Sequence, residues 1–201
     1  MLLDNGRLLE IGDTGNIMDR YNKLITERET LSGTQGNPDM EFALKKGNDK
    51  MPKSLRHGTF EAKILSVRLF DYKDKQRSIF ISGDQMTIQV ELIACEFIAE
   101  LTIGIMIRNR YGFEVYGTNT YHHGKFPGRC NKGEKVFVSF TQKINMAPDD
   151  YFVTIALHPG GTHIIKCFDW WNNAISFKVL PSLSPFSGIV NLNSEINFRR
   201  D

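Results

Sequence analysis

Apolar and polar residues alternate along several short runs in the part of the chain after residue 60. A period of two places one face of a strand in a core and the other in solvent, as in antiparallel sheets. Turn-forming residues separate the runs at 82–84, 109–112, 131–133, 148–150 and 159–161. The pattern predicts an all-β body of roughly eight strands over residues 58–181, arranged as an immunoglobulin-like antiparallel β-sandwich. The alternating apolar residues are Ile88, Val90 and Leu92; Leu101, Ile103, Ile105 and Ile107; Val136, Val138 and Phe140; Tyr151, Val153, Ile155 and Leu157; and Ile175, Phe177 and Val179.

Residues 1–30 have a different pattern. Leucine pairs at 2–3 and 8–9 flank Asn5-Gly6, a dipeptide that tolerates the positive φ angles of a tight hairpin turn. Asn16 then caps a predicted short helix. A hairpin and one helix cannot bury a core alone, so the segment is predicted to be a short α/β remnant of another domain. The apolar face of the predicted helix comprises Ile17, Met18, Tyr21, Leu24 and Ile25.

A polar stretch at residues 31–57 is predicted to be a linker. Its Lys and Arg residues stand among few large apolar ones, which is typical of a solvated segment. The formal net charge is only +2 and no basic stripe runs along one segment, so we expect no nucleic-acid partner. Residues 31–35, Leu-Ser-Gly-Thr-Gln, look like the LSGGQ signature of ABC ATPases. The turn-forming residues 36–39 that follow do not fit the helix that this signature opens.

The chain after Pro181 is predicted to be a separate extension, residues 182–201. Pro181 and Pro185, with the small residues around them, detach its apolar residues from the preceding strand. A strand from Gly188 to Ile196 would need an acceptor edge. In a homodimer that edge could belong to the partner, which predicts a strand swap.

Candidate chemistry outside the sheet is sparse. The phosphate-binding pattern G-x-x-x-x-G-K-[ST] is absent, as is a G-x-S-x-G elbow, and no pair of carboxylates stands out for glycoside hydrolysis. We therefore expect no enzymatic activity and no catalytic residues in this chain. Cys95, Cys130 and Cys167 are predicted to be reduced structural thiols, and the histidines lack zinc-ligand spacing, so neither a metal nor another cofactor is expected. No apolar run reaches the length of a membrane span, and no signal peptide is found.

The first residues carry a family resemblance. Leu3, Gly6, Leu9, Gly12, Ile17 and Tyr21 fit a pattern that resembles the last strands and helix of an ABC transporter ATPase domain. If the resemblance holds, the nucleotide-binding machinery lies upstream of this segment.

The order of an ATPase end, a polar linker and a β-sandwich resembles the Wzt-type ATPase subunits of bacterial O-antigen polysaccharide exporters. The segments that resemble the C-terminal domain of that family are 60–69, 83–90, 105–120, 150–155, 169–179 and, as its closing segment, 188–192. The resemblance implies a non-catalytic carbohydrate-binding module that recognises O-antigen polysaccharide for export. It also implies a longer protein that binds ATP, partners a membrane-spanning exporter subunit and works in the cytoplasm at the inner face of the inner membrane.

The sugar-binding face is predicted from strand geometry. A three-residue loop in the hairpin around Asn109 would align Ile107 with Phe113 and Ile105 with Val115, and would place Tyr116 across from Gly104. In an immunoglobulin-like order, the strand around residue 153 neighbours the first strand of this hairpin. Rings that pack on sugar faces then lie beside hydrogen-bonding groups. The predicted carbohydrate-binding residues are Met106, Arg108, Glu114, Tyr116, Thr118, Phe152, Thr154 and His158, with Tyr121, His122 and Trp171 as secondary candidates.

Two other interpretations stay open at this point. The aromatic residues of this face could cover a sheet edge or meet a subunit. The domain would then be a protein-interaction or dimerisation module of the exporter that does not contact glycan.

Overall fold

The computed structural model describes residues 1–4, 6–12, 17, 20, 56–161, 166–183 and 185–200. Its contacts divide the chain into two units, Met1–Lys53 and Ser54–Asp201. In the first unit, β1 (Leu2–Asp4) and β2 (Arg7–Glu10) pair antiparallel, which confirms the predicted hairpin. Gly6 adopts φ +76° in its turn. Ile17 and Arg20 are helical, and the rest of the predicted helix and the segment 31–35 lie outside the described residues.

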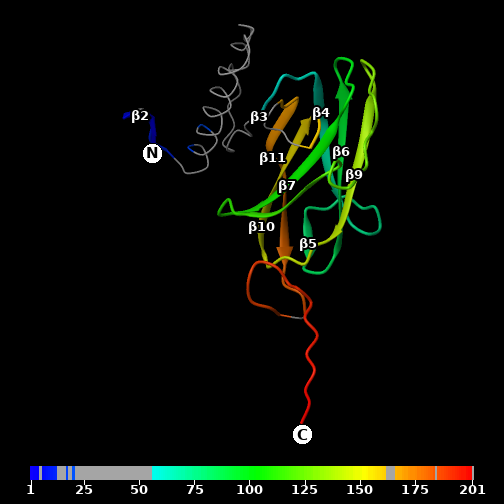
Figure 1. The fold of residues 1–201 in the computed structure, drawn as a ribbon. Helices are drawn as coiled ribbons and strands as arrows, with labels where there is room; N and C mark the ends of the chain where they lie inside the picture. The colour runs from blue at the N-terminus through cyan, green and yellow to red at the C-terminus, as the bar shows by residue number, and fades with distance from the viewer. Residues whose placement is uncertain are drawn as a thin grey trace. The chain divides into compact units, whose positions relative to one another are not determined.

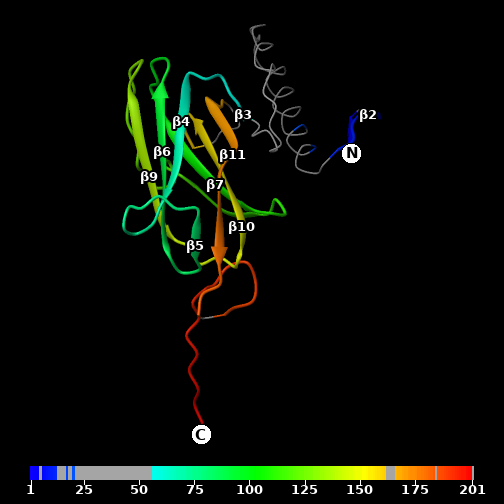
Figure 2. The same ribbon diagram turned by 180° about the vertical axis from the view of Figure 1, so that it is seen from behind.

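The second unit is a sandwich of two sheets (Figures 1 and 2). The larger sheet has the strand order β3-β11-β10-β7-β8, and β5 pairs in parallel with β11. The smaller sheet has the order β4-β6-β9. All pairs other than β5 with β11 are antiparallel, which confirms the predicted fold class. The strands are β3 (Arg56–His57), β4 (Ala62–Phe70), β5 (Ile79–Ile81), β6 (Gln85–Ala94), β7 (Thr102–Asn109), β8 (Glu114–Asn119), β9 (Lys135–Lys143), β10 (Asp149–His158) and β11 (Asp169–Leu180).

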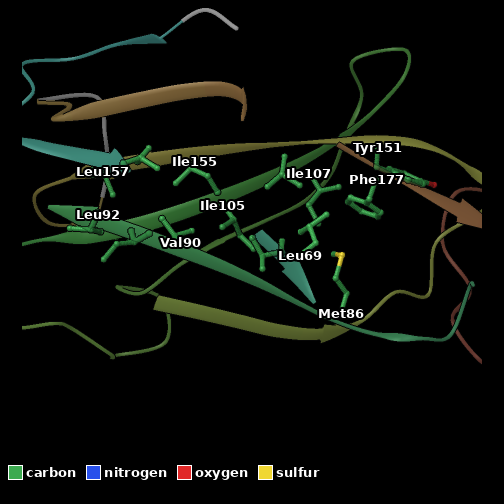
Figure 3. Packing of buried hydrophobic residues seen from close by; sticks show 14 of the residues in the cluster. Leu69, Met86, Val90, Leu92, Ile105, Ile107, Tyr151, Ile155, Leu157 and Phe177 are labelled. Carbon is green, nitrogen blue, oxygen red and sulfur yellow. The ribbon is translucent and has the colours of Figure 1, made fainter. Parts of the chain in front are cut away.

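The alternating residues of the two sheets meet in one core. Figure 3 shows Val90 and Leu92 of β6 facing Ile105 of β7 and Ile155 of β10, and all four are at most 3% exposed. This is the packing that a period of two predicts for a sandwich with one solvated face on each sheet.

Tyr151 of β10 closes one end of this core. Its ring stacks on Phe177 with 5.5 Å between centroids, and its hydroxyl donates a 2.8 Å hydrogen bond to the carbonyl of Ala147. Burial raises the pKa of Tyr151 to about 12. A tyrosine that bonds back to the backbone a few residues upstream also occurs at the corner of immunoglobulin sandwiches.

An ion pair with a fully buried carboxylate fixes β3 to the sandwich. Arg56 Nε donates a 2.8 Å hydrogen bond to Asp169 Oδ1. Arg56 Nη2 pairs with Asp169 Oδ2 and also donates to the carbonyl of Ile64. The amide of Ile64 donates to Asp169 Oδ2 at 2.7 Å, and the guanidinium of Arg56 lies 4.5 Å from the ring centroid of Trp171. These contacts join β3, β4 and β11. Residues 56–57, at the end of the predicted linker, thus form a strand of the larger sheet.

Among its described residues, the C-terminal extension makes one bridge to the sandwich, between Met146 and Val190. The flanking hydrogen bonds run from Ala147 N to Ile189 O and from Asn191 N to Asn145 O. Described residues beyond Asn191 form no strand in this single chain, so the strand predicted from Gly188 to Ile196 is not formed here. A strand needs a neighbouring edge, and among the described residues only the bridge at Met146 pairs with this segment. Leu192, Ile196 and Phe198 are 84%, 76% and 92% exposed.

Candidate functional site

The hairpin between β7 and β8 turns through residues 110–112. Asn109 N donates to Phe113 O at 3.1 Å, and Gly112 N donates to Asn109 O at 3.0 Å. Gly112 adopts φ +81°, as the last residue of such a three-residue loop requires. The Asn109 side chain holds the loop by accepting hydrogen bonds from the amides of Tyr111 and Phe113.

A β-bulge at Val115 changes the register of this hairpin. Arg108 pairs with Glu114, whereas Ile107 pairs with Tyr116, which leaves Val115 as the extra residue. Val115 packs against the core. The predicted alignments of Ile107 with Phe113, Ile105 with Val115 and Gly104 with Tyr116 are wrong, because the loop begins one residue later, so that Asn109 faces Phe113, and the bulge then adds a further shift.

The bulge decides which predicted residues share a face. Directly opposed residues of an antiparallel pair project to the same side, and the outer side carries Met106, Arg108 and Glu114 as predicted. Tyr116 and Thr118 instead oppose core-facing Ile107 and Ile105. Their predicted place on the outer face is thus wrong, because the inserted residue shifts the rest of β8 by one position. Tyr116 stays 43% exposed because β8 is at the edge of the sheet.

β10 lies beside β7, as the immunoglobulin-like order predicts. Phe152 opposes Arg108 and is partly exposed. Thr154 opposes Met106 and His158 opposes Thr102, but each is only 2% exposed. Alternation assigned both residues to the outer side, yet solvent does not reach them, so neither can bind a large ligand directly.

Arg108 is the centre of a hydrogen-bonded group on the outer side. Its Nη2 donates to Glu114 Oε1 at 2.7 Å, and its Nη1 donates to Thr154 Oγ1 at 3.3 Å and to Asn172 Oδ1 at 3.4 Å. Thr154 Oγ1 donates to Asn172 Oδ1 at 2.7 Å. The guanidinium of Arg108 on β7 is thus held by side chains of β8, β10 and β11. We call the surface formed by Met106, Arg108, Glu114, Phe152 and Asn172, with Thr154 beneath, the Arg108 face.

Sequence reasoning missed Asn172. It reaches the Arg108 face because β11 bulges where residues 172–174 oppose the single residue Thr154 of β10. Asn173 adopts φ +50° in this bulge, and its amide donates to Thr154 Oγ1. Asparagine tolerates positive φ better than most residues, so the Asn-Asn pair within a predicted strand was the available signal.

The two tryptophans of β11 have separate roles. Trp171, a secondary candidate, opposes Ile155, packs against the core and supports the guanidinium of Arg56. Trp170 opposes Ala156 and stacks with His57 at 6.0 Å between centroids. Of this pair, Trp170 therefore lies on the same side as the Arg108 face.

The other secondary candidates follow β8. Tyr121 is 45% exposed and meets Phe126 edge to face, with 5.7 Å between centroids. His122 is exposed, and its amide donates to Asn119 Oδ1 at 2.7 Å. Tyr121 and His122 follow the C-terminal end of β8, whereas Glu114 of the Arg108 face lies at its N-terminal end.

The described residues offer little else for chemistry. No group of three His, Cys, Asp or Glu residues among them could hold a metal ion. Burial raises the pKa of the Cys130 thiol and raises that of Cys167 to about 12, which keeps both thiols protonated near neutral pH. Within the described part of the chain, no helix has the length and apolar composition needed to cross a membrane.

The chain is similar to several known proteins. The family model described as the Wzt C-terminal domain matches residues 53–192. The crystal structure of the C-terminal domain of wzt is similar, with a TM-score of 0.67 and 18% identity over 74% of this chain and 90% of that chain. A beta-glucuronidase from glycoside hydrolase family 2 aligns with a TM-score of 0.37 and 17% identity over 53% of this chain and 10% of that chain. No curated protein matches the chain.

Proposed function

Because the chain belongs to the Wzt C-terminal domain family, we propose that its sandwich binds O-antigen polysaccharide on the Arg108 face, for export by an ABC transporter. Membership of the family supports a role in the O-antigen exporter. That the sandwich itself binds the glycan is our proposal, and it is based on the geometry of the Arg108 face.

The observation that carries the proposal is the way Arg108 is held. Glu114, Thr154 and Asn172 fix its guanidinium on an outer sheet face, with the ring of Phe152 directly opposite on the next strand. A pre-positioned charged donor loses little freedom when it bonds a ligand hydroxyl. A ring beside it offers an apolar surface for the C–H groups of a sugar. This combination suits a polyhydroxylated chain better than it suits a purely apolar partner.

The remaining partners follow from the family. We expect the ATPase activity to reside in a domain upstream of the sandwich, with residues 1–30 as its end, so that ATP and the membrane-spanning exporter subunit are partners of the longer protein. We therefore expect the sandwich to work in the cytoplasm at the inner face of the inner membrane. No catalytic residue is assigned to the sandwich, whose contribution is binding.

Arg108→Ala is expected to weaken binding of the cognate O-polysaccharide by about tenfold or more, because charged hydrogen bonds to a ligand contribute about 1.5 to 3 kcal/mol. Calorimetric titration with this polymer and with an unrelated polymer measures the loss. The matched control is Arg77→Ala, since Arg77 is ion-paired with Asp71 and lines neither the Arg108 face nor a pocket. Equal binding by the Arg108 variant, the Arg77 variant and the parent would place the glycan elsewhere. A parent that binds no polymer would favour the protein-interaction alternative.

The exposed C-terminal extension supports a homodimer. Ile189, Val190, Leu192, Ile196 and Phe198 are 42% to 92% exposed and need an acceptor. Deleting residues 182–201 should therefore give a monomer or an insoluble protein, whereas the parent sediments as a dimer. A soluble dimer that persists after the deletion would show that the interface lies elsewhere.

A further inference from the structure

A groove of about 570 Å³ runs along β9, beside the segment 125–127 that follows β8. Its lining mixes rings and aliphatic side chains with hydroxyl and charged groups. The apolar lining residues are Phe126, Pro127, Val136, Phe137 and Val138, and the polar ones are Thr120, Lys125, Glu134, Lys135 and Ser139. The groove shares no residue with the Arg108 face, although Val136 and Val138 also pack against the core.

Two aromatic rings in the groove are open to solvent. Phe137 of β9 is 61% exposed, and Phe126 is 51% exposed, with the ring of Tyr121 set against it. Phe137 opposes Glu91 of β6, whose carboxylate accepts hydrogen bonds from Lys135 Nζ at 3.1 Å and from Ser66 Oγ at 3.1 Å. Exposed rings among fixed polar groups are the same combination that the Arg108 face presents.

Strand β8 connects the Arg108 face with the groove. Glu114 begins β8 and belongs to the Arg108 face, and Thr120, directly after β8, lines the groove. Six residues of strand span about 20 Å. Between these ends lies Tyr116, 43% exposed, and no described strand pairs with the outer edge of β8. An elongated ligand that follows this edge would meet both surfaces.

We infer that the groove is a second subsite for the same polysaccharide, so that one polymer chain contacts the Arg108 face and the groove together. The inference rests on the proposed function. A polymer held at the first subsite presents its neighbouring sugars to the second at high effective concentration, which raises affinity without a new contact type. Tyr116, on the edge between the two, becomes a contact of the bridging sugars.

Binding of oligosaccharides of increasing length, cut from the cognate polymer, tests the inference. The parent should bind polymer at least about tenfold more tightly than the shortest fragment. Phe137→Ala should lose most of this gain with length while binding at the Arg108 face is unchanged, whereas Arg108→Ala should weaken short and long fragments alike. Tyr72→Ala is the matched control, because Tyr72 is 66% exposed in the loop after β4. Equal urea midpoints verify that each variant is folded.

The failures are distinguishable. If Phe137→Ala binds polymer as the parent does while Arg108→Ala does not, the groove is no subsite and the proposed function stands. If the parent binds no fragment and no polymer, both proposals fall. If Phe137→Ala leaves polymer binding intact and changes the sedimenting mass, the groove is an interface between copies of the chain, which overturns the inference.

Discussion

Asp169→Ala is expected to lower the free energy of unfolding of the sandwich by about 3 kcal/mol, since breaking a buried ion pair leaves its partner groups without an acceptor. Asp169 is fully buried and accepts hydrogen bonds from Arg56 and from the amide of Ile64. The Arg56 side chain is 30% exposed, so water can solvate it after the substitution and reduce the loss. Urea unfolding followed by tryptophan fluorescence measures the change.

The control for this variant is Glu96→Ala. Glu96 pairs with Lys132, and their side chains are 59% and 69% exposed. Exposed pairs contribute about 0 to 1 kcal/mol. A loss for Asp169→Ala no larger than the loss for Glu96→Ala would contradict the role that we assign to the buried pair.

Gly58→Ala should cost at least about 2 kcal/mol of stability. Gly58 adopts φ +147°, and a Cβ atom there would lie 2.3 Å from the carbonyl oxygen of Phe168. The same carbonyl accepts a 2.7 Å hydrogen bond from the amide of Phe60, so the backbone cannot relax without giving up that bond. The midpoint and slope of urea unfolding, compared with those of the parent, give the loss.

Gly133→Ala is a control that measures the cost of a positive φ without the steric clash expected at Gly58. Gly133 also adopts a positive φ, +84°, but a Cβ atom there would meet nothing within 4 Å. Its loss should stay near the 1 to 2 kcal/mol typical of a left-handed residue. Equal losses at Gly133 and Gly58 would mean that the contact with Phe168 is not decisive.

Strands β6, β7, β9, β10 and β11 could be predicted from the sequence because their alternation is visible over five to seven positions. β3 and β5 could not, since they have two and three residues. The position of β3 comes from Arg56 and Asp169, which are 113 residues apart in the chain. No local pattern reports a contact of that range.

The side of the sheet on which each candidate residue lies could be predicted where no bulge interrupts the strand. Arg108 and Glu114 come next to the hairpin loop, before the bulge, and their predicted side is confirmed. Tyr116 comes after the bulge and was assigned to the wrong side. Asn172 was missed because a second bulge brings it to Thr154. Alternation also indicates which way His158 points without revealing that neighbouring groups cover it.

The place of β11 in the larger sheet affects how the chain folds during its synthesis. β3, β5 and β10 all pair with β11, which is the last strand of the sandwich to leave the ribosome. At usual translation speeds, Asp169 is synthesised about 6 to 23 s after Arg56. Throughout that interval β3 and β5 have no partner, and the larger sheet stays incomplete. A nascent chain stalled before residue 169 should therefore be cut by protease, whereas one released after Leu180 should resist it.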